Sequence, residues 1–201
     1  MNSLGINQGT SGNVSVRFKG GLLITPSNLP YDRCQPEDIV YVSLRGAYYS
    51  IRKPSSEWRM HRDILMARPE ANAVLHAHPT FATSLACLRR PIPAFHYMVA
   101  IAGGKKIPCS NYFTFGTQEF SEAAINALRG YTACLLANHG VLVIGTSLEN
   151  ALFRTIELET LAKQYCQVLQ IGEPILLNDQ EMDAVLEKFH NYTEITSPDD
   201  I

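Results

Sequence analysis

The sequence predicts a single α/β domain built on a mixed, largely antiparallel sheet. Its 201 residues suit one compact domain, and the balance of 46% hydrophobic to 18% charged residues is typical of globular proteins. Short apolar runs of strand type alternate with longer stretches in helical rhythm, and hairpin turns join some of the strands. No internal repeat, low-complexity stretch or linker divides the chain. We therefore expect one domain over residues 1–201.

The N-terminal part predicts short strands followed by one helix. Residues 19–21 (Lys-Gly-Gly) are typical of a hairpin turn between the first two strands. Ser55 or Ser56 is expected to cap a helix that continues to Pro69. The strands are expected at residues 14–18, 22–25 and 39–43, with residues 48–51 as a candidate partner of the third.

The C-terminal part alternates strands and helices. Its clearest helix is expected at residues 147–171, where apolar positions recur with helical spacing. The pattern at residues 96–101 is mixed and predicts no single element. The remaining expected elements are strands at 73–78, 133–138 and 141–144 and helices at 82–88, 117–128 and 179–189.

Composition excludes several classes of protein. The net charge of -2 gives no basic surface for nucleic acid or anionic lipid. No apolar stretch approaches the roughly 20 residues of a membrane-spanning helix, and the first residues lack the pattern of a signal peptide. The five cysteines are scattered and never spaced as CxxC, which indicates reduced thiols in a cytoplasmic protein. Any metal ligands should therefore be nitrogen and oxygen.

Two histidines, His76 and His78, flank one alanine directly after an apolar run. Side chains at i and i+2 of a strand point to the same face, so we expect the two imidazoles side by side. This suits a divalent transition metal, zinc first, although two hydrogen-bonded histidines at a strand end show the same pattern. His139, in NHG at the end of another apolar strand, adds a third nitrogen. Three histidines complete the count for a catalytic zinc with an open position.

Glu57 is the candidate carboxylate for the same site. It lies at the first turn of its expected helix behind two serines, where it also suits a capping box. Two nearby stretches suit an anion: residues 9–13 (GTSGN) can turn backbone amides inward, and residues 55–57 (SSE) add hydroxyls at a helix N-terminus. Glycine-rich turns are also common in plain hairpins. A metal site beside two anion loops predicts a small phosphorylated substrate.

Several longer stretches resemble one known family. After GINQGTSGNVSVR come LLITPSNLPY, KPSSEWRMH, NAVLHAHP, IPAFHYMVAIAGG, FGTQEFSE and LLANHGVLVIG, in this order. The chain is similar to the class II aldolase and adducin-head family from Leu4 to about Tyr192. The resemblance implies a three-layer α/β/α domain with a central, mainly antiparallel mixed sheet. It also implies that the N-terminal helix usual in the family is missing or abbreviated here.

The resemblance further implies a metal centre with catalytic groups. The family's zinc ligands correspond to His76, His78 and His139, which implies one Zn²⁺ per subunit. Its acid/base glutamate corresponds to Glu57, which in the family also binds zinc when substrate is absent. Tyr97 corresponds to a catalytic tyrosine supplied by a neighbouring subunit. The implied assembly is a homotetramer with active sites at subunit interfaces.

The substrate contacts implied by the family are polar on one side and aromatic on the other. The phosphate-binding positions correspond to Asn13, Ser27, Asn28, Ser55 and Ser56, and the aromatic residues of the aldehyde side correspond to Phe115 and Tyr192. Plain packing is the alternative for these aromatic residues. The family usually has glycine where this chain has Asn28. Asparagine tolerates positive φ, so the turn is expected to survive, with a side chain that either crowds the phosphate or binds it.

The implied reaction is zinc-dependent, reversible cleavage of L-fuculose 1-phosphate, or a closely related ketose 1-phosphate. Its products are dihydroxyacetone phosphate and a short aldehyde such as L-lactaldehyde. Two related activities use a similar framework: a pentulose-phosphate 4-epimerase and a methylthioribulose-phosphate dehydratase or aldolase. A non-catalytic adducin-like interaction module is the alternative from another class, and it would be expected to have lost metal ligands that this chain retains.

Overall fold

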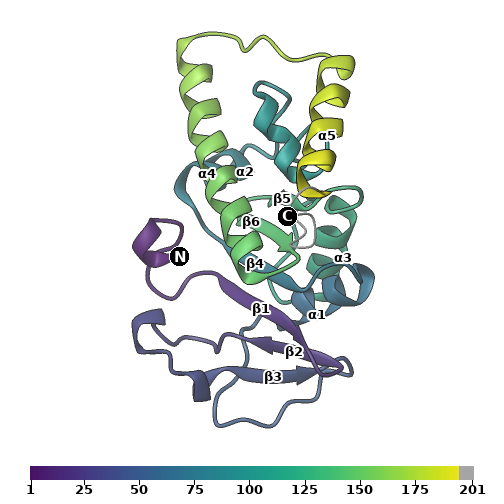
Figure 1. Ribbon diagram of the computed structural model, residues 1–201. Coiled ribbons are helices and arrows are strands. Elements are labelled where there is room, and N and C mark those ends of the chain that lie inside the picture. The colour runs from purple at the N-terminus through teal and green to yellow at the C-terminus, as the bar shows by residue number, and fades with distance from the viewer. Residues whose placement is uncertain (195–201) are drawn as a thin grey trace.

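One six-stranded sheet forms the middle of the molecule in the computed structural model, which describes residues 1–194 and the side chains of residues 1–190 (Figure 1). The strand order is β3-β2-β1-β4-β6-β5, and each pair of neighbours is antiparallel. The sequence predicted a mixed sheet, but parallel pairing within residues 1–194 is limited to an isolated bridge between Cys109 and Leu135. The strands are β1 (Asn13–Phe18), β2 (Gly21–Ile24), β3 (Val40–Ser43), β4 (Ala73–Ala77), β5 (Ala133–Leu136) and β6 (Gly140–Gly145).

The N-terminal strands agree with the sequence prediction except at one point. β1 and β2 form the expected hairpin, in which Lys19 and Gly20 have φ values of 41° and 74°, as a type I′ turn requires. Residues 48–51, the candidate partner of β3, form no strand. Tyr49 and Ile51 are 97% and 89% exposed. Pairing there would bury little apolar surface to offset the entropy lost on ordering the backbone.

Helices lie on both faces of the sheet at β4, β5 and β6, which confirms the three-layer arrangement (Figure 1). Successive residues of β4 point to opposite faces: Val74 packs with residues of α1 and α3, whereas Leu75 packs with residues of α2 and α4. All five residues of β4 are buried, so the middle of the sheet is covered on both sides. The helices are α1 (Trp58–Ala67), α2 (Thr80–Cys87), α3 (Gln118–Ala127), α4 (Leu148–Ile171) and α5 (Asp179–Glu194).

Two helices begin where local capping predicts. The side chains of Thr117 and Ser147 accept backbone N–H groups from the first turns of α3 and α4. α1 differs, because its N-cap residue is Glu57 rather than Ser55 or Ser56. Neither serine is the N-cap residue, although the Ser55 hydroxyl accepts the backbone N–H of Glu57 over 3.3 Å in the turn that leads into the helix. The Glu57 carboxylate makes no capping bond either, which leaves it available for other contacts.

Two further segments depend on tertiary contacts. α2 begins two residues earlier than expected because Glu159 of α4 accepts the backbone N–H groups of Phe81 and Ala82. The segment with the mixed pattern forms a 3₁₀ helix, Tyr97–Ala102, against which α5 packs. Shorter 3₁₀ turns lie at Asn2–Leu4, Tyr31–Arg33 and Pro36–Asp38.

None of the helices within residues 1–194 is both long and apolar enough to cross a membrane. All five cysteines lie in this part of the chain and are free thiols.

Candidate active site

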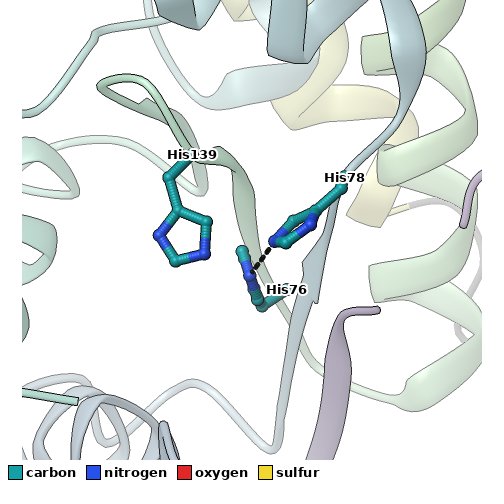
Figure 2. Close-up of side chains that lie close together, drawn as sticks. All are labelled: His76, His78 and His139. Carbon is teal, nitrogen blue, oxygen red and sulfur yellow. Dashed lines mark hydrogen bonds between the residues drawn. The ribbon is translucent and has the colours of Figure 1, made fainter. Parts of the chain in front are cut away.

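Three histidines converge at one end of the sheet (Figure 2). His76 belongs to β4, His78 follows that strand, and His139 lies in the turn between β5 and β6. β6 pairs with β4, which brings this turn beside the two other histidines. The ring centroids lie 4.7 to 4.9 Å apart, and one nitrogen of each ring lies within 4.8 Å of the others. The arrangement predicted from the HxH and NHG stretches is confirmed.

The three imidazole rings are uncharged, so each can offer a nitrogen lone pair to a metal ion. Burial is the main cause that lowers the pKa of His76, His78 and His139, each to about 4. Nδ1 of His76 lies 2.8 Å from the carbonyl oxygen of Val141, and since that oxygen only accepts, Nδ1 carries the proton. Nε2 of His76 therefore presents a lone pair, 2.8 Å from Nε2 of His78.

Glu57 faces the same point from the start of α1. Its Oε2 lies 3.3 Å from Nε2 of His76, and its Oε1 lies 3.4 Å from Nε2 of His139. Asn13 donates a hydrogen bond of 2.7 Å to Oε2, while Oε1 is buried with no hydrogen-bond partner. The carboxylate is thus held against the histidines instead of capping its helix.

The donor set fits a divalent cation. The site brings uncharged imidazoles close to a buried carboxylate that has an unpaired oxygen. Without a proton or cation between these groups, their lone pairs would repel one another. Nitrogen and oxygen ligands of this kind suit zinc and other transition metals. The group formed by His76, His78 and His139 can therefore hold a metal ion, with Glu57 close enough to complete its shell.

A cavity of about 230 Å³ opens beside this group. Two loops on its wall are joined to each other: the Ser27 N–H donates to the Lys53 carbonyl, and the Ser55 N–H donates to the Thr25 carbonyl. Asn28 has φ of 57°, which confirms that it adopts the left-handed conformation. The lining residues are Thr10, Gly12, Asn13, Pro26, Ser27, Asn28, Ser55, Ser56, Glu57, His78, Phe115 and His139.

The cavity therefore brings together most of the substrate-contacting residues predicted from the sequence. Phe115 lines it and is 59% exposed, so this ring is not plain core packing. Asn13 lines it too, but its side-chain amide already bonds Glu57 and His61. Tyr97 is 51% exposed on its 3₁₀ helix and is not among the lining residues of this chain. Tyr192 lies in α5, with its side chain outside the described residues.

Sequence reasoning missed three polar residues around the site. Oδ1 of Asn7 accepts the backbone N–H of His78. His61 and Ser15 form buried hydrogen bonds that lead to Asn13. A signal existed for the last two, because His61 follows Glu57 by one helical turn and Ser15 follows Asn13 by two strand positions.

Comparison with known proteins shows the family to which this chain belongs. Residues 1–166 match the family model of the class II aldolase and adducin N-terminal domain. The chain belongs to the class II aldolase and adducin family, as the quoted motifs predicted. Its close relatives are named aldolases, and the chain is an aldolase, a lyase that acts on carbon–carbon bonds.

Two groups of aldolases are similar to this chain. It is 54% identical over 190 residues to a 5-methylthioribulose-1-phosphate/5-deoxyribulose-1-phosphate aldolase of Rhodospirillum rubrum, covering 94% of this chain and 86% of that protein. It is 47% identical over 193 residues to the L-fuculose phosphate aldolase of Escherichia coli strain K12, covering 96% and 90%. A solved L-fuculose 1-phosphate aldolase superposes with a TM-score of 0.89 at 43% identity, covering 92% of this chain and 88% of that one.

Proposed function

We propose that this aldolase is zinc-dependent and reversibly cleaves a ketose 1-phosphate to dihydroxyacetone phosphate and a short aldehyde. The observation that carries the proposal is the convergence of three uncharged imidazoles and Glu57 on a cavity whose other wall is two polar loops. His76, His78 and His139 would hold the ion, one per chain. When bound, zinc supplies Lewis-acid polarisation of a carbonyl oxygen.

The residues of this chain would divide the remaining work of the retro-aldol reaction. The C3–C4 bond breaks, the C4 hydroxyl would pass its proton to Tyr97 of a neighbouring subunit as the aldehyde forms, and C3 of the other fragment gains a proton. Glu57 would deliver the proton to C3 in cleavage and remove it in condensation. The loops that carry Ser27, Asn28, Ser55 and Ser56 would hold the phosphate and orient the ketose.

The substrates of both groups of relatives share one chemical feature. L-Fuculose, 5-deoxyribulose and 5-methylthioribulose 1-phosphates carry no hydroxyl on the carbon farthest from the phosphate. Phe115 offers an apolar surface at the exposed side of the cavity, which suits such an end. The two candidate activities are therefore L-fuculose 1-phosphate cleavage and, favoured by the 54% identical relative, cleavage of the 5-deoxy- or 5-methylthioribulose phosphates.

A parallel assay separates these candidates. Purified protein with one equivalent of zinc is incubated with each of the three ketose 1-phosphates, and released dihydroxyacetone phosphate is measured with glycerol-phosphate dehydrogenase and NADH. We expect release from at least one, with the largest kcat/KM identifying the substrate. Release from none of the three would overturn the proposed substrate class. Metal analysis of the same preparation tests zinc.

We propose that the active form is a homotetramer in which Tyr97 acts at a neighbouring subunit's site. The exposed Tyr97 ring, away from its own cavity, supports this. Light scattering is expected to show a tetramer, and Tyr97→Phe is expected to lose turnover while it keeps its metal. Mixing Tyr97→Phe with Glu57→Gln chains should restore part of the activity, because some mixed sites combine two intact residues. An active monomer would contradict the assembly.

Asn28 is expected to tune phosphate binding without abolishing it. Its amide can donate a hydrogen bond worth about 1.5 to 3 kcal/mol to a charged group, whereas left-handed strain costs roughly 1 to 2 kcal/mol. Because these terms nearly cancel, Asn28→Gly should change KM for the sugar phosphate by less than about tenfold, with kcat similar. Ser55→Ala and Ser56→Ala should raise KM more, since each removes a hydroxyl donor. A hundredfold gain in activity for Asn28→Gly would contradict the proposed substrate.

Gly140 is expected to be intolerant of any side chain. A Cβ atom there would lie 2.4 Å from the Ala77 carbonyl oxygen and 2.8 Å from Cδ2 of His78. Gly140→Ala should therefore displace His78 and weaken metal binding by about 10- to 100-fold, the range seen when a ligand loses its support. Competition with a chromophoric chelator measures this. Gly172→Ala is the matched control, because its Cβ atom meets nothing within 4 Å.

We further propose that residues 1–201 act as one domain in the cytoplasm. Free thiols at all five cysteines suit a reducing compartment. Cell fractionation with an antibody to the chain tests the location.

A further inference from the structure

Four buried polar residues connect α1 to β1 beside the candidate metal group. Glu57 and His61 are one helical turn apart, and Asn13 and Ser15 are two strand positions apart, so each pair points in one direction. The two pairs face each other, and all four residues are at most 5% exposed. Asn13 also lies opposite His76 in the register of β1 with β4. The four residues therefore form a compact polar cluster behind the candidate site.

Three hydrogen bonds run through this cluster in series. Ser15 Oγ lies 2.7 Å from Nδ1 of His61. Nε2 of His61 lies 2.5 Å from Oδ1 of Asn13. Nδ2 of Asn13 donates to Oε2 of Glu57 over 2.7 Å. The series ends at the Glu57 carboxylate.

The chemistry of the bonded groups determines which atom carries the proton in each hydrogen bond. Oε2 of Glu57 accepts the bond from Asn13, so the amide NH₂ of Asn13 must face Glu57 and the amide oxygen must face His61. Nε2 of His61 must then carry a proton, because the amide oxygen only accepts. Burial lowers the pKa of His61 to about 3, so its ring is uncharged and Nδ1 accepts from the Ser15 hydroxyl. In each of the three hydrogen bonds, the donor therefore lies on the Ser15 side and the acceptor on the Glu57 side.

We propose that His61 and Ser15 are positioning residues that act through Asn13 to hold the carboxylate of Glu57. The inference rests on the proposed acid/base role of Glu57. It assigns different tasks to the two carboxylate oxygens: Oε2 is anchored by Asn13, and Oε1, which has no hydrogen-bond partner, exchanges the proton with substrate. Without the His61 donor, the Asn13 amide can rotate and present its oxygen to the carboxylate, which would repel Glu57 from its position.

Kinetic measurements on three variants, two at His61 and one at Ile64 of α1, test the positioning role. His61→Phe keeps the ring volume but loses the hydrogen-bond donor to Asn13. We expect its kcat to fall about 10- to 100-fold, as when other groups that support a reacting residue are removed. Its metal content should stay near that of the wild type, and its KM should change by less than about threefold. His61→Gln is expected to restore part of kcat, because its amide can donate to Asn13. Ile64→Ala is the control: it removes a buried side chain one turn along α1 and should lower Tm without lowering kcat per folded chain.

A spectroscopic readout tests the proton positions without any turnover. Protein labelled with ¹⁵N-histidine should show His61 as an uncharged Nε2–H tautomer in metal-free samples at neutral pH. Ser15→Ala should shift it toward a mixture of tautomers, because Nδ1 loses its donor. A His61 Nδ1–H tautomer in the wild type would overturn the inference.

The kinetic outcomes separate this inference from the proposed function. Wild-type kcat in His61→Phe, together with an inactive Glu57→Gln variant, would overturn the positioning role alone. Equal losses of kcat in His61→Phe and Ile64→Ala would reduce His61 to a structural residue. A Glu57→Gln variant with normal turnover would overturn the acid/base role and the positioning role together.

Discussion

Replacing His76 by alanine is expected to abolish metal binding and aldol cleavage together. The ring provides a buried lone pair 2.8 Å from Nε2 of His78 and 3.3 Å from Oε2 of Glu57, so its removal takes away the central donor of the group. Loss of mere supporting residues costs about 10- to 100-fold in metal affinity or activity, and loss of a ligand should exceed that range. Metal analysis and the dihydroxyacetone phosphate assay measure both effects.

Two further variants make this result interpretable. His139→Asn removes a second ligand from a turn, where His139 is less buried than His76 and a folding defect is less of a concern. His190→Ala replaces an exposed histidine of α5 and should leave metal content and turnover unchanged. Purified protein without a divalent ion, or a folded His76→Ala variant with full metal and activity, would contradict the proposed metal centre.

Glu57→Gln is expected to keep most of the metal and lose about 10²- to 10⁴-fold in kcat, the usual contribution of general acid–base catalysis. Glutamine has the size of glutamate, and its amide oxygen can still accept the bond from Asn13 that Oε2 accepts in the native protein. Its NH₂ group would then replace Oε1 and cannot take up a proton. The variant thus removes proton transfer while it preserves the packing around α1.

The comparison with an exposed glutamate checks this interpretation. Glu119→Gln in the first turn of α3 makes the same chemical change away from the cavity, and it should have wild-type kcat and metal content. Equal activity of Glu57→Gln and the wild type would reduce Glu57 to a residue at the start of its helix. Complete loss of metal in Glu57→Gln would instead make Glu57 mainly a ligand.

Much of the fold follows from local sequence patterns. Thr117 and Ser147 mark the starts of α3 and α4 because an N-cap bond joins residues only a few positions apart. Lys19 and Gly20 mark the first hairpin for the same reason. The order of the strands across the sheet is not local, and neither is the start of α2, which depends on Glu159 from α4.

The candidate site divides in the same way. The sequence by itself determined that His76 and His78 share a face, because a strand repeats every two residues. It left two uses open for Glu57, a helix cap or a site carboxylate, since both suit the first turn of a helix. Only the tertiary structure decided between them: Asn13, 44 positions away in the chain, donates to the carboxylate and faces it toward the histidines. Local patterns set the backbone, but a buried polar side chain points where distant partners satisfy it.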